Sequence, residues 1–224
     1  MIVKMNQGKV IVIEGACDGI GKSTQYRLLK ERLENEGYKV ANHHFPSYNT
    51  DQGKLVEMYL EGKFGKTEDL SQYFINSLYA IDRAISWKTE LCPKFEEGNV
   101  VLLDRYTTSS LIYQSALIED ETEKNKFIDY VTDFEYNKLG IRMPDKVIFL
   151  TAPLNAINKM REARKINEGI QNDIHEKNKE FMEKVYNNAM YVSEYLKWDK
   201  IICNDGDKMK SIQEIHEEIY NRLK

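Results

Sequence analysis

The chain has 224 residues, of which 42% are apolar, so it is long enough to bury the core of one folded domain. Its 36 acidic and 32 basic side chains leave a formal charge of -4, which provides no positive field for nucleic acid or anionic lipid. No run approaches the ~20 apolar residues of a membrane span, and residues 1–9 lack the apolar core of a signal peptide. We therefore expect one cytoplasmic domain over residues 1–224, with neither a nucleic-acid nor a membrane partner.

Short β-rich runs alternate with long helical segments, a pattern typical of a parallel sheet whose strands are joined by crossover helices. Three of the runs are almost continuously apolar, as expected for strands that helices cover on both faces. Helical spacing follows the first run at Leu29 and Leu33, and recurs near the end at Met209, Ile212 and Ile215. The sequence thus predicts an α/β fold. The predicted strands are Val10–Glu14, Lys39–Phe45, Asn99–Asp104, Lys146–Leu150 and Lys200–Cys203.

The strongest motif is Val10–Thr24, where an apolar strand runs into a glycine-rich turn and then a helix. Glycines let backbone N–H groups turn inward, and with the helix N-terminus they form a cradle for phosphate. Lys22 adds a point charge for the β and γ phosphates, and the Ser23 hydroxyl is placed to ligate Mg²⁺. The residues predicted to bind ATP are Gly19, Ile20, Gly21, Lys22, Ser23 and Thr24.

This loop departs from the motif G-x-x-x-x-G-K-[ST] at its first position. Ala16 stands where the motif has glycine, and Gly15 comes one residue too early. Two interpretations stay open, because either the loop holds one extra residue or Ala16 takes the place of the first glycine.

The three cysteines, Cys17, Cys92 and Cys203, are far apart and form no CxxC pair. This spacing argues against a zinc knuckle or a disulfide framework, and free thiols fit a reducing compartment. Cys17 lies in the phosphate loop beside inward N–H groups and Lys22, both of which lower the pKa of a thiol. We therefore expect Cys17 to react with alkylating reagents faster than the other two cysteines, and Mg-ATP to slow this reaction. The neighbouring Asp18 opposes such a pKa shift, and a small inert loop residue is the alternative interpretation.

A second nucleotide-binding signal is the run Val100–Tyr106, in which an apolar strand ends in Asp104 and Arg105. Ligands bind at the carboxyl edge of the strands in open α/β sheets. A carboxylate there can hold Mg²⁺ through water, and a planar guanidinium suits a phosphate bidentately. Alone, the pair would equally fit a strand that ends in a surface salt bridge; beside a phosphate loop, it favours phosphoryl transfer.

The chain resembles thymidylate kinases from about Val10 to Asn221, and the order and spacing of the matching blocks are more specific than any single block. The resemblance implies a three-layer P-loop kinase fold, with a parallel five-stranded sheet and helices on both faces. It also implies Mg²⁺-dependent transfer of phosphate from ATP to dTMP, and a homodimer. The blocks that carry it are EGACDGIGKSTQ, HFPSY, YAIDRA, DRYTTSSLIYQ and KMREARK followed by NDIHE.

The same resemblance assigns residues to the phosphate and sugar of the acceptor. Asp18 would bond the sugar 3′-hydroxyl, although a turn aspartate can also bond its own backbone. Tyr48 stands where many members carry an arginine, and it would bond the monophosphate through its hydroxyl. Tyr113 would crowd the C2′ position of the sugar, so that a ribose hydroxyl would clash there.

The thymine base is assigned to another group of residues. Tyr79 and Arg83 are i and i+4 on a predicted helix, so they share one face. By resemblance, Tyr79 would stack on thymine and Arg83 would bond its O4. Ser110 and Gln114 are both candidates for the polar partner of thymine N3.

Phosphoryl transfer needs positive charge around the migrating group, and the phosphate loop carries only Lys22. In family members whose loop reads DGxGK, as here, a lid supplies the missing charge. The lid candidate is residues 155–175, where Arg161 and Arg164 at i and i+3 could lie on one helical face. The sequence does not choose between these two arginines, and a solvated basic helix face would have the same pattern. The predicted catalytic set is Asp18, Lys22, Arg105, Arg161 and Arg164.

Two other functions stay open from the sequence alone. One is a kinase for another nucleoside monophosphate or for a deoxynucleoside, against which the blocks YAIDRA and DRYTTSSLIYQ favour dTMP. The other is a nucleotide-dependent switch, which in its GTP-reading form should carry an NKxD-like motif. Asn204-Asp205 is the nearest pattern to such a motif, and we interpret it as a loop.

Overall fold

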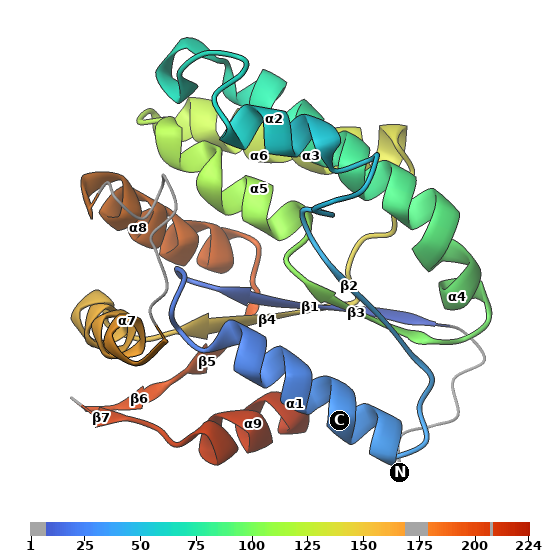
Figure 1. Ribbon diagram of the computed structural model, residues 1–224, viewed down its shortest axis with the longest axis vertical. Helices are drawn as coiled ribbons and strands as arrows, with labels where there is room; N and C mark the ends of the chain where they lie inside the picture. Colours follow the sequence, from blue (N-terminus) through green and yellow to red (C-terminus); the bar gives the residue numbers. More distant parts are fainter. Residues whose placement is uncertain (1–7, 169–178, 207) are drawn as a thin grey trace.

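The computed structural model describes residues 8–168, 179–206 and 208–224, with the backbone alone at residues 68, 162–168 and 179. Its centre is a sheet of five parallel strands in the order β2-β3-β1-β4-β5 (Figure 1). Each strand overlaps the run that the sequence predicts for it, so the α/β prediction is confirmed. The strands are β1 (Lys9–Gly15), β2 (Val40–His44), β3 (Val100–Asp104), β4 (Lys146–Thr151) and β5 (Asp199–Ile202).

A short antiparallel pair after β5 is absent from the sequence-based prediction. It consists of β6 (Asn204–Asp205) and β7 (Lys208–Met209). Met209 therefore lies in a strand, and its assignment to the final helix is wrong. The helix α9 (Ile212–Asn221) begins after Ser211, whose side chain completes a capping box that satisfies the first backbone N–H groups.

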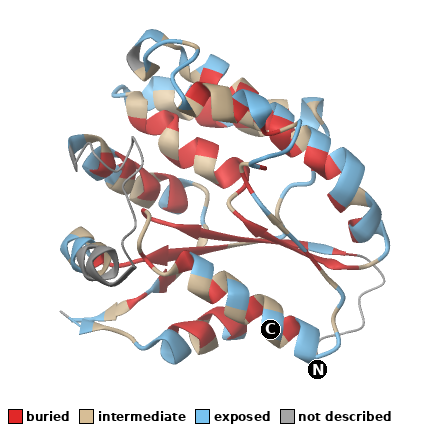
Figure 2. Cartoon of the chain, in the orientation of Figure 1, coloured by how far each residue is buried: buried red, intermediate tan, exposed pale blue. Residues whose placement is uncertain are grey.

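Helices cover both faces of the sheet (Figure 1). The alternate residues Ile11 and Ile13 of β1 pack in one core cluster with α1 (Lys22–Asn35) and α9. Val10 and Val12 pack in a second cluster with the helices on the opposite side. Because successive side chains of a strand point to opposite faces, β1 is buried on both. Figure 2 shows the sheet as a nearly continuous band of buried residues.

The remaining helices cover the second face and one flank of the sheet. Within the described part of the chain, no helix is both long and apolar enough to span a membrane. The α-helices are α2 (Lys54–Leu60), α3 (Gln72–Ser86), α4 (Cys92–Glu96), α5 (Thr107–Tyr113), α6 (Glu121–Thr132), α7 (Leu154–Glu168) and α8 (Lys179–Tyr195). Short 3₁₀ turns are η1 (Thr67–Asp69) and η3 (Ser115–Leu117), and π-helical turns are η2 (Trp87–Leu91) and η4 (Asp133–Lys138).

Both π-helical turns extend a long helix toward the core. η2 joins α3 to α4, where Pro93 has no N–H to give to the regular helical ladder, so the ladder loosens at this point. η4 continues α6 and contains Glu135, which is fully buried. A buried carboxylate needs a partner, and this one becomes important at the site described below.

The carboxyl ends of the central strands meet at one edge of the sheet. Ile13 of β1 and His44 of β2 both pair in register with Asp104 of β3, and Gly15 pairs with Leu150 of β4. The residues that follow these strands therefore gather at the edge where open α/β sheets bind ligands.

Helix α1 is also tied to the last helix of the described chain. Gln25 Nε2 donates to the carbonyl oxygen of Ile212 at 2.9 Å, and Arg32 Nη1 pairs with Glu217 at 2.7 Å. The helix that follows the phosphate loop is thus packed on residues almost two hundred positions later in the sequence.

Candidate active site

The structure of the loop between β1 and α1 shows what Gly15 and Ala16 do where the sequence departs from the phosphate-loop motif. The Ala16 N–H donates to the carbonyl oxygen of Leu150 at 2.9 Å, so Ala16 continues the strand pairing, and its methyl group is buried against Phe149. At Gly15, by contrast, a Cβ would lie 2.7 Å from Ile20 Cγ2. The position that requires glycine is therefore 15, and Ala16 fills a core position.

The second half of the loop has the backbone shape of an anion cradle. Gly19 and Gly21 have φ angles of 95° and 94°, which L side chains rarely adopt, and Gly21 directly precedes α1. The Ile20 side chain points into the core, so only its backbone faces the loop. Ser23 is exposed at the start of α1, and Thr24 beside it is half-buried. Inward N–H groups and a helix N-terminus suit the phosphates of a nucleotide.

Lys22 and Asp104 form a buried ion pair between the phosphate loop and the end of β3. The second carboxylate oxygen of Asp104 lies 3.0 Å from Nδ1 of His44. Burial disfavours the charge of Asp104, but the bond with His44 and the charge of Lys22 lower its pKa to about 2. His44 comes from the end of β2, and its place beside Asp104 follows from strand register, which the sequence does not reveal.

Asp18 and Arg105 form a second ion pair at the mouth of the site. The Tyr113 hydroxyl donates to the other oxygen of Asp18 at 3.3 Å, and its ring lies 5.5 Å from the Arg105 guanidinium. Burial opposes the charge of Asp18, but Arg105 and Lys22 outweigh it and lower the pKa of this carboxyl. Asp18 is therefore ionised at neutral pH.

Arg105 also has a strained backbone, with a φ of 67°. A non-glycine residue in this left-handed region costs about 1–3 kcal/mol, and such residues gather at functional sites. This conformation turns the chain at the end of β3, so that Asp104 pairs with Lys22 whereas Arg105 pairs with Asp18.

A third carboxylate, Glu14, is missed by the sequence analysis. It is fully buried at the end of β1 and accepts hydrogen bonds from the hydroxyls of Thr108 and Ser109 at 2.9 and 2.6 Å. It also accepts the Gly15 N–H at 3.0 Å. These bonds fix the phosphate loop to the start of α5. In the sequence Glu14 is simply the last residue of an apolar strand, so no local signal marks it.

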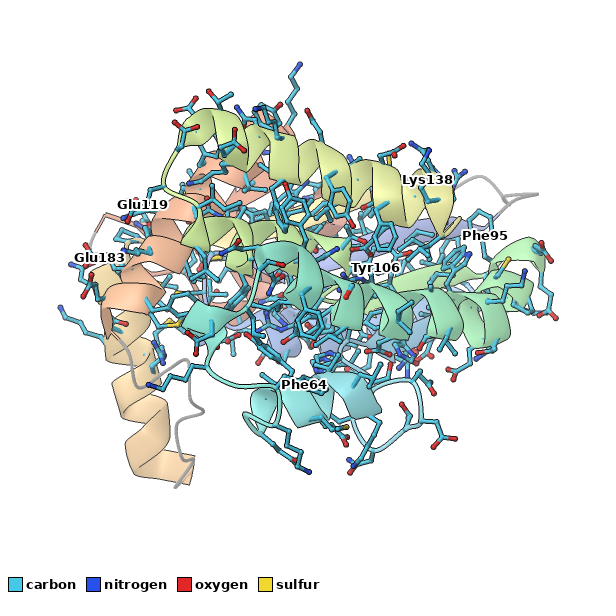
Figure 3. All side chains as sticks on the ribbon, turned by 90° about the horizontal axis from the view of Figure 1, so that it is seen from above. Phe64, Phe95, Tyr106, Glu119, Lys138 and Glu183 are labelled. Carbon is cyan, nitrogen blue, oxygen red and sulfur yellow. The ribbon has the colours of Figure 1, made fainter. Side chains whose placement is uncertain are left out.

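A cavity of about 250 Å³ opens beside the Asp18–Arg105 pair. Its walls come from the loop after β2 and from α3, α5 and the start of α8. In Figure 3, which looks down on these helices, Tyr106 lies near the middle of the helical layer. Every residue predicted to bind the acceptor lines this cavity: Asp18, Tyr48, Tyr79, Arg83, Arg105, Ser110, Tyr113 and Gln114.

The cavity wall contains polar groups suited to a planar ligand. Tyr79 is half-buried and packs edge-to-face on Tyr59, with 6.2 Å between the ring centroids. Arg83 is buried and donates to Ser110 Oγ at 2.8 Å. Gln114 Oε1 is buried and finds no hydrogen-bond partner among the described residues. Buried polar groups normally have partners, so an orphan in a cavity wall favours a ligand that supplies one.

The two lid arginines differ in what the structure describes. Arg161 of α7 lies over the phosphate loop, where its side chain occupies the space that a Cβ on Gly19 would need. Its charge also acts on Asp18 and Cys17. The side chain of Arg164, and residues 169–178 of the predicted lid, lie outside the part that the structure describes.

The proposed metal ligands Ser23 and Asp104 both lie at the phosphate loop. No cluster of three or more His, Cys, Asp or Glu side chains that could hold a metal occurs among the described residues. The donor set is thus one exposed hydroxyl and one carboxylate, which suits a Mg²⁺ ion that takes its other ligands from water and substrate phosphates.

The expectation of a reactive Cys17 is wrong. Its side chain is 3% exposed, and burial, with a smaller contribution from Asp18, raises its pKa to about 12 despite the charge of Arg161. Because Ala16 and Cys17 both pack inward, the thiol is held away from the N–H groups that would stabilise a thiolate. Burial also raises the pKa of Cys203 to about 12.

We predict that brief maleimide treatment at neutral pH labels Cys92 first, because it alone of the three is partly exposed. Cys17 and Cys203 should label slowly, since each thiol is buried and its pKa is raised. Peptide mass mapping gives the order, and unfolded protein, in which all three label, is the control. Labelling of Cys17 as fast as Cys92 would contradict the buried loop.

Comparison with known proteins gives these features a family context. The family model described as thymidylate kinase matches residues 13–219. A probable thymidylate kinase of Pyrococcus abyssi is 31% identical over 219 residues, which cover 97% of each chain. The thymidylate kinase of Caldicellulosiruptor saccharolyticus is 32% identical over 196 residues, or 85% of each chain. The solved structure of thymidylate kinase from Candida albicans has the same fold, with a TM-score of 0.73 and 24% identity over 97% of this chain and 91% of that one. The chain therefore belongs to the thymidylate kinase family, whose members phosphorylate dTMP to dTDP.

Proposed function

We propose that this chain transfers the γ-phosphoryl group of ATP to the phosphate of dTMP, forming ADP and dTDP with Mg²⁺ as cofactor. The proposal rests on one observation: the phosphate loop and the cavity are adjacent and share Asp18. Asp18 belongs to the phosphate loop, yet it lines the cavity and pairs with Arg105. ATP bound at the loop and dTMP bound in the cavity would thus meet at these residues, which supports direct transfer of the phosphoryl group.

On the donor side, the loop residues Gly19–Thr24 would bind the ATP phosphates through their backbone N–H groups. Lys22 would exchange part of its pairing with Asp104 for the β and γ phosphates. Ser23 and Asp104 would hold Mg²⁺, which would neutralise part of the phosphate charge.

On the acceptor side, Arg105 and Tyr48 would bind the monophosphate of dTMP. Asp18, held ionised by Arg105, can accept a hydrogen bond from the 3′-hydroxyl of the sugar while it stays paired with the Arg105 guanidinium. Tyr113 lies against both residues, which supports its assignment to the C2′ side of the sugar.

Recognition of the base follows from the polar groups of the cavity wall. Thymine presents an acceptor at O4 and a donor at N3. Arg83 is a donor and would bond O4, and the unpartnered Gln114 Oε1 is an acceptor suited to the N3–H. This assignment favours Gln114 over Ser110 as the N3 partner, because Ser110 already accepts from Arg83. Tyr79 would stack on the ring.

The lid would complete the charge around the transferring group. Arg161 lies over the phosphate loop, so we assign it the larger part in stabilising the transition state, with Arg164 as a second contributor. Closure of the lid, residues 155–175, would also keep water away from the γ-phosphate.

We further propose that the whole chain is one cytoplasmic domain that acts as a homodimer. In support of the dimer, Phe74, Ile81 and Ile85 lie on one face of α3 with 40%, 38% and 42% of each residue exposed. Leu55 of α2 adds a similarly exposed apolar side chain. Exposed apolar side chains that share one helix face are typical of a protein interface, and the molecular mass in solution tests the dimer.

The proposed reaction is tested by an assay of purified protein with Mg-ATP and dTMP, dUMP, dCMP, AMP or thymidine. We expect dTMP to be the best acceptor, judged by kcat/KM. The variant Lys22→Met keeps the apolar stem but removes the charge, so it should lose most transfer activity while its circular dichroism spectrum is unchanged. Near-normal turnover in this variant, or ATP binding without transfer to any acceptor, would contradict the proposal.

The lid assignment predicts different effects for its two arginines. Neutralising both Arg161 and Arg164 to alanine should lower kcat by ~10²-fold or more with less effect on the KM for dTMP, because their charge acts on the transition state. The single change Arg161→Ala should account for most of this loss, and Arg164→Ala is the matched control on the same helix. Steady-state kinetics decide, and an effect confined to KM would assign the arginines to ground-state binding instead.

Sugar selection gives a separate test. Tyr113→Ala should relax the preference for dTMP over ribothymidine monophosphate, which we expect to be at least about 10–200-fold in the wild type, the range that pocket shape commonly supplies. Tyr113→Phe is the control, because it removes the hydroxyl that bonds Asp18 but keeps the ring. The ratio of kcat/KM values for the two substrates is the measured quantity. If that ratio is the same in Tyr113→Ala as in the wild type, the ring is packing and not a steric gate.

A further inference from the structure

Among the residues that the structure describes, one buried acid belongs neither to the proposed transfer chemistry nor to the family blocks. Glu135 lies on the π-helical turn η4, has no exposed surface, and faces Arg83 of α3. Its Oε2 lies 2.6 Å from Arg83 Nε, and its Oε1 lies 2.7 Å from Arg83 Nη2. The Thr107 hydroxyl donates to the same Oε2 at 2.9 Å. The Glu135 carboxylate thus binds one edge of the Arg83 guanidinium through both of its oxygens.

The donors of Arg83 can be counted. A guanidinium carries five N–H groups, and Glu135 and Ser110 together occupy the one on Nε and both on Nη2. Among the described residues, Nη1 makes one long contact, 3.5 Å to the carbonyl oxygen of Tyr106. Because Arg83 also lines the cavity, Nη1 is the nitrogen with an N–H left to offer a ligand there.

The bidentate bond also fixes which edge of the guanidinium faces the cavity. A guanidinium held at both Nε and Nη2 cannot rotate about its last side-chain bond without losing one or both of these hydrogen bonds. The negative charge of Glu135 neutralises a cation that is 2% exposed, so the cavity meets an oriented hydrogen-bond donor and not an uncompensated charge. Both effects act on base recognition and neither acts on the phosphates.

We propose that Glu135 is a positioning residue that sets base specificity, by holding Arg83 with a donor directed at the position-4 oxygen of a pyrimidine. This inference rests on the proposed function, because it takes dTMP as the acceptor. Thymine and uracil carry an accepting oxygen at position 4, whereas cytosine carries a donating amino group there. A fixed donor therefore rejects dCMP by setting two donors against each other, as sites built for one hydrogen-bond pattern do.

The π-helical turn explains how a residue so far along the chain reaches this place. α6 runs over the outside of the helical layer, and its continuation η4 ends at Lys138, which Figure 3 labels at the end of that helix. The wider turn brings Glu135 into contact with Arg83 of α3 and with Thr107 at the start of α5.

The test compares three variants with the wild-type protein. Glu135→Gln keeps the shape but offers only one accepting oxygen and turns an amide donor toward the guanidinium. Thr107→Val keeps the charge of Glu135 and removes only the hydroxyl that holds it, at a position that does not line the cavity. Lys138→Ala is the matched control, because it alters an exposed end of the same π-helical turn.

For each protein, KM and kcat are measured with dTMP and dCMP, and the melting temperature reports folding. In Glu135→Gln we expect the KM for dTMP to rise about tenfold or more, the kcat for dTMP to change less than about threefold, and the ratio of kcat/KM for dTMP over dCMP to fall about tenfold or more. Thr107→Val should move the KM and the ratio in the same direction by a smaller factor, and Lys138→Ala should leave both unchanged.

A purely structural role for Glu135 would lower the melting temperature and the activity on both nucleotides alike, and an unchanged dTMP to dCMP ratio would overturn the proposal. If Glu135→Gln fails to fold, Thr107→Val decides by the same ratio. Wild-type protein that prefers a different acceptor would overturn the proposed function and this inference together. Wild-type protein that prefers dTMP, with variants that keep its KM and its ratio, would overturn this inference alone.

Discussion

The rest of the site depends on the buried ion pair between Lys22, which follows the phosphate loop, and Asp104 at the end of β3. Lys22 is the first residue of α1, directly after the turn from β1, and Asp104 is the last residue of β3. The backbone ladder between β1 and β3 places their carboxyl ends side by side, and the ion pair ties the first turn of α1 to the end of β3. Removing Asp104 would take from Lys22 the carboxylate with which it is paired, whereas removing Lys22 would leave Asp104 bonded to His44. The geometry of the phosphate loop and that of the strand end are therefore not independent.

The same rule of paired charges organises the acceptor side. Arg105 has Asp18, and Arg83 has Glu135, so each of these cations has an anion within hydrogen-bond distance. The two pairs differ in exposure: 18% and 35% of the Arg105 and Asp18 side chains are exposed, whereas the Arg83–Glu135 pair is buried. A partly exposed pair can exchange partners with a ligand at modest cost, while a buried pair keeps its geometry. This difference fits the proposed phosphate binding at Arg105 and the proposed hydrogen bond from Arg83 to the base.

Much of the fold could be read from local pattern. Apolar runs identified the strands, because a strand buried on both faces has almost no polar positions. The residues of the predicted acceptor site were assigned from the resemblance to thymidylate kinases, because an aromatic residue and an arginine at helical spacing do not by themselves indicate a nucleotide. What local pattern could not supply is pairing over long distances in the sequence. Glu135, His44 and Glu14 matter because of what they meet across the fold, and nothing beside them in the chain marks that. The error at Cys17 has a related cause: loop composition suggested an activated thiol, whereas the inward packing that raises its pKa is decided by tertiary contacts.

The packing of α1 on α9 has a consequence for how the protein is made. α1 follows the phosphate loop near the start of the chain, but its inner face is completed by residues of α9, through Gln25 to Ile212 and Arg32 to Glu217. On the ribosome the loop and α1 are made first, and α9 follows much later, since Ile212 lies 187 positions after Gln25. A nascent chain therefore carries the nucleotide motif before α9 has been made, and α1 lacks these two contacts until then.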